Sequence, residues 1–113
     1  MSTRQTGIKG EGIACEFLMQ QGVTIKARNI RTPYGEIDIL GDDHDCLVFA
    51  EVKTRKTDTF GLPEEAVNRK KREHMINSAL SYLQENKSLD IDWRIDVIAI
   101  NISKTKNNPK KGW

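Results

Sequence analysis

The spacing of apolar and polar residues predicts a helix followed by three strands in the first half of the chain. Residues 6–21 carry an apolar face at helical spacing, and Gly22 follows as a helix stop. Residues 23–28 alternate apolar and polar side chains, which indicates a half-exposed strand. After turn chemistry at 32–35, two further strands are expected at 36–40 and 46–54.

The acidic stretch Asp42–Asp45 lies between these last two strands and predicts that they form a hairpin. A loop is expected at 58–63, and Pro63 suits the first position of a helical turn. Asn68 is a candidate cap for a longer helix.

The second half of the chain predicts one helix and one strand. The helix runs from Asn68 to about Asn86, and residues 92–100 form an apolar strand. The expected apolar stripe of the helix is Met75, Ile76, Ala79, Leu80 and Leu83, and Lys71 and Arg72 fall on its extension toward the N-terminus. A helix between two strands makes a crossover, so strands 46–54 and 92–100 should be parallel. The order α-β-β-β-α-β therefore predicts an α/β fold, a mixed sheet flanked by helices.

Length and composition indicate one domain with a basic tail. The chain has 113 residues, and residues 1–100 are expected to form the domain. Residues 101–113 hold four lysines and no acid, and we expect a flexible tail there. Because the tail supplies so much of the positive charge, the formal net charge of +2 says little about a nucleic-acid partner.

The two cysteines and the apolar runs favour a cytoplasmic location. Cys15 and Cys46 have no CxxC or Cys/His spacing, so a reduced protein without a zinc site is expected. The N-terminus has no apolar segment typical of a secretory signal, and no run is long enough to cross a membrane.

Charged residues occupy unexpected positions within the apolar pattern. With the turn at 43–46, Asp38 lies opposite Glu51 in the hairpin, and Lys53 shares their face. Glu11 lies on the apolar face of the first helix. Two carboxylates directly opposite each other repel, and Mg²⁺ would relieve that repulsion and leave positions for a substrate phosphate. The alternative is an edge strand whose charges block aggregation.

A basic stretch follows this hairpin between Lys53 and Arg72. Its candidate phosphate contacts are Arg55, Lys56, Lys70, Lys71 and Arg72. A solvated loop and helix start would show the same pattern, so charge alone leaves both interpretations open.

Several blocks of the sequence resemble the YraN-like family of bacterial proteins. They are "GEGIACEFL" (10–18), "RNIRTPYGEIDIL" (28–40), "VFAEVKTR" (48–55), "FGLPEEAVNRKKR" (60–72) and "WRIDVIAI" (93–100). That family is largely uncharacterised and is similar to archaeal Holliday-junction resolvases of the restriction-endonuclease-like, PD-(D/E)XK group. The resemblance implies a restriction-endonuclease-like sheet flanked by helices. The proline of the motif is absent, because Ile37 precedes Asp38.

The resemblance also implies roles for individual residues. Asp38 and Glu51 would bind Mg²⁺ (or Mn²⁺), with the Val52 carbonyl as a third ligand. Lys53 would be the catalytic lysine, and Glu11 would match the helix glutamate that approaches the metal. The partner would be DNA, including branched DNA, with no membrane partner. Because resolvases act as dimers, a homodimer is an expectation by resemblance.

Three functions remain open from the sequence. The first is a metal-dependent endonuclease that hydrolyses phosphodiesters. The second is a non-catalytic nucleic-acid-binding module that uses the same fold and its basic residues. The third is an interaction protein whose acidic cluster is structural.

Overall fold

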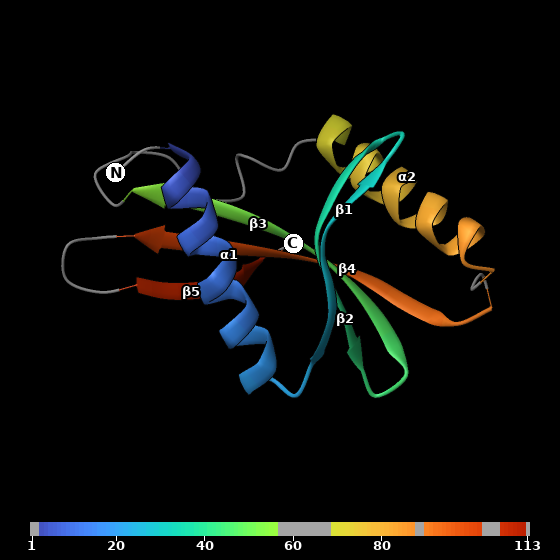
Figure 1. Cartoon of the computed structure of the whole chain (residues 1–113), viewed down its shortest axis with the longest axis horizontal. Helices are drawn as coiled ribbons and strands as arrows, with labels where there is room; N and C mark the ends of the chain where they lie inside the picture. Colours follow the sequence, from blue (N-terminus) through green and yellow to red (C-terminus); the bar gives the residue numbers. More distant parts are fainter. Residues whose placement is uncertain (1–2, 57–68, 88–89, 103–106, 113) are drawn as a thin grey trace.

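Two helices lie on opposite faces of a five-stranded sheet in the computed structural model (Figure 1). The structure describes residues 3–56, 69–87, 90–102 and 107–112, and for residues 3–8, 55, 56, 102 and 107–112 it describes the backbone alone. The helices are α1 (Thr3–Gln20) and α2 (Arg69–Glu85). The strands are β1 (Thr24–Thr32), β2 (Gly35–Asp43), β3 (Cys46–Lys56), β4 (Asp92–Ile102) and β5 (Asn107–Gly112).

The strands lie in the sheet in their order along the chain. Neighbours are antiparallel except β3 and β4, which are parallel because α2 connects them. The predicted α/β class and the order α-β-β-β-α-β from α1 to β4 are confirmed. The expected loop at 58–63, the helical turn from Pro63 and the cap at Asn68 lie outside the described residues.

Each face of the sheet has its own apolar core. On one face, α1 packs Ala14, Cys15 and Leu18 against Val23, Ile39, Ala50, Ile98 and Ile100. On the other, α2 packs Ala79 and Leu83 against Ile37, Leu40, Leu47 and Phe49. The neighbours Phe49 and Ala50 belong to different cores because strand side chains alternate between faces. Continuous apolar runs therefore mark strands that are covered on both sides.

The buried face of α2 differs from the predicted stripe. Ala79 and Leu83 are fully buried as expected, but Ile76 and Leu80 remain 37% and 40% exposed. Ser78 is buried instead, and its hydroxyl bonds that of Thr32 at 3.1 Å. That polar contact rotates the buried face of the helix toward the β1–β2 hairpin.

The β2–β3 hairpin has the register that the acidic turn predicted. Asp42 pairs with Leu47, and Asp43 pairs with Cys46 across a two-residue turn. His44 and Asp45 both have positive φ, 51° and 72°, as a type I′ turn requires.

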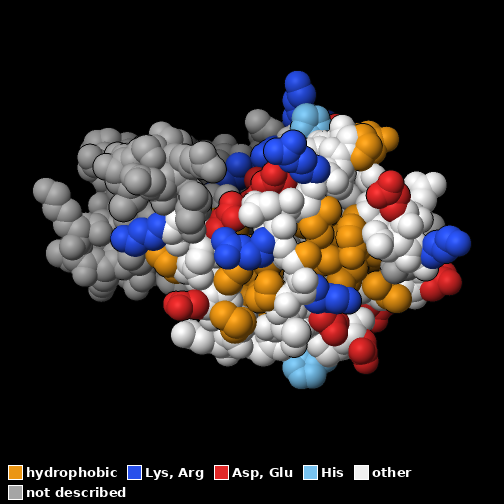
Figure 2. Space-filling view, in the orientation of Figure 1, with side chains coloured by type: hydrophobic (Ala, Val, Ile, Leu, Met, Phe, Trp, Pro, Cys, Tyr) orange, Lys and Arg blue, Asp and Glu red, His pale blue; other side chains and the backbone are white. Residues whose placement is uncertain are grey.

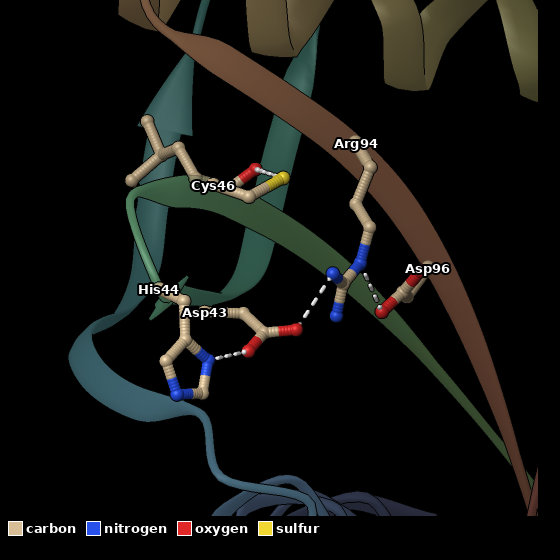
Figure 3. A network of polar contacts seen from close by, with 6 residues as sticks. Asp43, His44, Cys46, Arg94 and Asp96 are labelled. Carbon is tan, nitrogen blue, oxygen red and sulfur yellow. Dashed lines mark hydrogen bonds and ion pairs between the residues drawn. The ribbon is translucent and has the colours of Figure 1, made fainter.

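A polar network joins this turn to β4 (Figure 3). Arg94 lies 2.8 Å from Asp43 and 3.2 Å from the buried Asp96, and Asp43 also contacts His44 at 2.8 Å. Hydrogen bonds from Arg94 and then from His44 lower the pKa of Asp43. The Asp43 carboxylate therefore has structural partners in the turn and in β4.

The C-terminal residues correct one expectation. A flexible tail was predicted from residue 101, but Asn107–Gly112 forms β5, which pairs antiparallel with β4. Pro109 pairs with Ile100 in this outermost strand, where a missing N–H is tolerated. Backbone hydrogen bonds, rather than an alternating side-chain pattern, define the strand.

Within the described part of the chain, neither helix is both long enough and apolar enough to span a membrane.

Candidate active site

The candidate site lies where β2 separates from β3. The β2–β3 ladder runs from the turn to Ile39, which pairs with Ala50, and Asp38 is the next residue. On the other side of β2, the pairs Arg28–Ile39 and Ile30–Ile37 flank Asn29, whose φ of 55° is left-handed within β1. Figure 1 shows the β1–β2 ribbon continuing toward α2 while β3 runs away from it. Asp38 therefore stands at the fork of the sheet.

The Asp38 side chain takes the place of a backbone acceptor in the pairing of β2 with β3. Its Oδ2 accepts a hydrogen bond from the Val52 N–H at 2.8 Å, beyond the last backbone pair. Burial, the charge of Glu51 and a hydrogen bond with the Glu51 carboxyl raise the pKa of Asp38 to about 7, with Glu11 adding a smaller effect. The two carboxyl groups of β2 and β3 are therefore close enough to share a proton.

Glu51 is nearly buried and is held by two ammonium groups. Its side chain is 11% exposed, and its Oε1 lies 3.3 Å from Lys53 Nζ and 3.1 Å from Lys71 Nζ. Lys53 was expected on this face of β3, two residues along the strand. Lys71 comes from the first turn of α2. In the sequence it falls on the extension of the apolar stripe of this helix toward the N-terminus.

Glu11 reaches the same region from α1 because the helix approaches β3 closely. A β-carbon at Gly10 would overlap the Thr54 hydroxyl, so only glycine permits this approach. Arg28 lies 3.3 Å from Glu11 Oε1. The Asn29 amide, oriented to satisfy both acids, donates to Glu11 at 3.3 Å and to Glu36 at 3.1 Å.

Neither Arg28 nor Asn29 was predicted to belong to the site. The predicted strand ended at residue 28, whereas β1 continues to Thr32. Nothing in their residue types separates them from other exposed strand positions. Their contact with Glu11 depends on how α1 is placed on the sheet.

On the face of the molecule shown in Figure 2, acidic and basic side chains are interspersed rather than gathered in separate patches. Beside them, a half-open pocket lies between the sheet and α2. Its lining residues are Glu36, Ile37, Phe49, Ala50, Glu51, Met75, Ser78 and Ile95. The carboxylate of Glu51 thus borders both the acidic site and an apolar hollow.

The donor set at the fork fits a divalent ion held by few protein ligands. Asp38 and Glu51 supply two carboxyl groups, and burial followed by the charge of Glu51 raises the pKa of Asp38. The Val52 N–H points to Asp38, and the C=O of a strand residue points to the same edge as its N–H. Among the described residues no three Asp, Glu, His or Cys side chains cluster as a complete metal site. Mg²⁺ needs only one or two carboxylates.

The predicted phosphate contacts divide into three groups. Lys70 and Arg72 are exposed in the first turn of α2. Lys71, between them, points to Glu51 instead. The side chains of Arg55 and Lys56 lie outside the described residues, although their backbones continue β3 beside β4.

Comparison with known proteins identifies the family. The model of an uncharacterised protein family, UPF0102, matches residues 10–100. The chain belongs to the UPF0102 family. The resemblance to YraN-like proteins is thereby confirmed.

Relatives with high identity carry the same UPF0102 name. A UPF0102 protein of Francisella tularensis subsp. tularensis is 46% identical over 105 residues, which cover 91% of this chain and 90% of the relative. One from Dehalococcoides mccartyi is 41% identical, covering 89% and 84%. One from Thermodesulfovibrio yellowstonii is 40% identical, covering 95% of each. The UPF0102 match contains the whole acidic site, from Glu11 to Lys71.

Proposed function

We propose that this UPF0102 protein is a divalent-cation-dependent endonuclease that hydrolyses phosphodiesters in DNA. The observation that supports this most strongly is the pair of adjacent carboxyl groups, Asp38 and Glu51, at the fork of the sheet with Lys53 beside it. Two acids and a lysine around one point can hold a cation and a phosphate together.

Asp38, Glu51 and the Val52 carbonyl would hold Mg²⁺ or Mn²⁺. When bound, such an ion would polarise the scissile phosphate and the attacking water. The Lys53 side chain is 24% exposed and 3.3 Å from Glu51, so its ammonium can turn toward a phosphate oxygen. There it would offset the negative charge that develops in the transition state.

Glu11 would act at the border of the site rather than as a central ligand. Its carboxylate is already contacted by Arg28 and by the Asn29 amide. These partners fix its orientation and keep its charge toward Asp38. We expect Glu11 to orient solvent near the cation.

Cleavage of labelled DNA tests this proposal. Single-stranded, duplex, flap and four-way-junction DNA would be incubated with Mg²⁺, Mn²⁺ or EDTA, and wild type compared with Asp38→Asn and Lys53→Ala. The proposal expects metal-dependent cutting by wild type that both variants lose. Lys87→Gln, an exposed lysine beyond α2, provides the control. Metal-dependent cutting that both Asp38→Asn and Lys53→Ala retain would contradict the proposal.

A nucleic-acid-binding module is the second candidate. Exposed Lys70 and Arg72 lie beside the fork and can contact phosphates without any chemistry. Binding that weakens steeply with salt, without cleavage under any metal condition, would favour the module.

A further inference from the structure

Lys71 is a positively charged residue at the candidate site that the proposed chemistry does not use. Its Nζ lies 3.1 Å from Glu51 Oε1, although the residue belongs to α2 and Glu51 to β3. Its helix neighbours Lys70 and Arg72 are exposed. The phase of α2 therefore selects one of three adjacent basic residues for the acidic site.

The Lys71 ammonium group would compete with a divalent ion for the space beside the Glu51 carboxylate. Lys53 and Lys71 both contact the same oxygen of Glu51, so this carboxylate is already neutralised without a metal. A divalent cation bound to Glu51 would lie within a few ångströms of both ammonium groups, and repulsion at that distance is strong away from bulk water. At least one ammonium group must leave when the ion enters.

The geometry favours Lys71 as the group that leaves. The Lys71 side chain is 37% exposed, against 24% for Lys53, so a path into solvent is open to it. Lys53 shares β3 with Glu51 and stays beside it whatever the helix does. The long lysine stem lets the Lys71 ammonium swing outward, while its methylenes remain packed on the protein.

We propose that Lys71 is a positioning residue that holds Glu51 in the ion-free protein and is displaced when a divalent cation binds. The inference rests on the proposed metal site. Lys71 then sets the ion affinity of the site without being one of its ligands. Removal of the Lys71 charge should favour the ion-bound state.

Calorimetric titration with Mn²⁺ in the absence of DNA tests the competition. Lys71→Met should lower the Kd for Mn²⁺ at least three-fold, and Lys71→Arg, which restores the positive charge, should return it to within two-fold of wild type. Arg69→Met is the matched control, because it removes a charge from the same helix turn. Arg69 is 92% exposed and pairs with Glu73, so its loss should leave the Kd within two-fold of wild type.

Two failures can be told apart. If Mn²⁺ binds wild type and Lys71→Met with equal affinity, or binds Lys71→Met more weakly, the role of Lys71 is refuted while the metal site stands. If Mn²⁺ binds no form of the protein, the metal site fails and the Lys71 proposal fails with it. Neither result depends on whether DNA is cut.

A measurement on wild type avoids any effect of substitution on folding. Brief acetylation by an amine-reactive ester, read by peptide mass spectrometry, should modify Lys71 several-fold faster in saturating Mn²⁺ than in EDTA. Lys87, an exposed residue beyond the C-terminal end of α2, should react at the same rate in both. Unchanged or slower modification of Lys71 with Mn²⁺ would overturn the proposal.

Discussion

At the scale of the residue, Asp38 shows how the sheet creates an acidic site. The strand pairing stops beside it, its Oδ2 takes the Val52 N–H, and the neighbouring carboxyl of Glu51 faces it. Burial and this like charge oppose ionisation, so the pKa of Asp38 rises from 3.8 to about 7. Ionised Asp38 therefore lowers the stability of the folded protein at neutral pH, and a bound cation would reduce this cost.

The stability of the ion-free protein should reflect this cost. A raised folded-state pKa means that the folded protein binds an extra proton between about pH 4 and about pH 7, so the contribution of Asp38 to stability falls as pH rises through that window. Asp38→Asn should therefore be more stable than wild type at pH 8, by about 1–2 kcal/mol because partial solvent exposure screens the full effect. Urea denaturation in EDTA at pH 5 and pH 8 measures the difference, which should be smaller at pH 5.

Asp43→Asn is the matched control, for which the change in stability at pH 8 should have the opposite sign. Arg94 lowers the pKa of Asp43, so its carboxylate stabilises the fold at neutral pH and this contribution is lost as pH falls. This variant should be less stable than wild type at pH 8. A loss of stability for Asp38→Asn at pH 8 would contradict the proposed charge crowding.

At the scale of the element, the hairpin could be predicted but the fork could not. The turn chemistry at 43–46 fixed which β2 residue faces which β3 residue, and the Asp42–Leu47 pair follows from it. The fork begins where the β2–β3 ladder stops at the Ile39–Ala50 pair, close to the left-handed backbone of Asn29 in β1. The pattern of apolar and polar residues in one strand does not indicate where its pairing with a neighbouring strand ends.

The three basic residues at the start of α2 are a second case in which the sequence could not predict which side chain enters the site. Lys70, Lys71 and Arg72 are chemically alike, and helical periodicity placed Lys71 and Arg72 together on the stripe. In the structure, Lys71 contacts Glu51, and Lys70 and Arg72 are exposed. β5 was missed because its polar residues have no alternation, and its pairing uses the backbone of β4.

The close approach of α1 to β3 yields a test at this scale. Gly10→Ala should destabilise the protein despite the better helix propensity of alanine, because its β-carbon would overlap the β-branched Thr54. Gly12→Ala is the control, since a β-carbon there has no atom within 4 Å, and it should stabilise by about 0.5–1 kcal/mol. Thermal denaturation measures both. Equal stabilisation by the two substitutions would show that α1 does not need the close approach.

At the scale of the whole molecule, the fold brings residues of four elements, α1, β2, β3 and α2, to one site. Glu11 comes from α1, Asp38 and Glu51 from two strands, and Lys71 from α2 on the opposite face. Exposed basic residues of α2 lie next to this point and would contact the DNA backbone. Binding and chemistry would thus depend on separate residues.

The salt dependence of DNA binding checks this separation. Lys70→Ala/Arg72→Ala should reduce the slope of log K against log salt by about 1–2, because each lost phosphate contact releases one fewer counterion. Lys87→Gln, about 25 Å along the helix axis from Lys71, should leave the slope unchanged. Fluorescence anisotropy on labelled DNA in EDTA provides the measurement. An unaltered slope in the double variant would remove the start of α2 from the DNA contact surface.

The most direct test of the central claim is the single-turnover cleavage rate of Glu51→Gln beside wild type, with saturating Mg²⁺ and the DNA form that wild type cuts best. Glutamine keeps the size of the side chain but removes the charge that would hold the ion. The account predicts a rate at least about 100-fold lower, near 3 kcal/mol in activation free energy, with DNA binding retained. A Glu51→Gln variant that cuts as fast as wild type would contradict it.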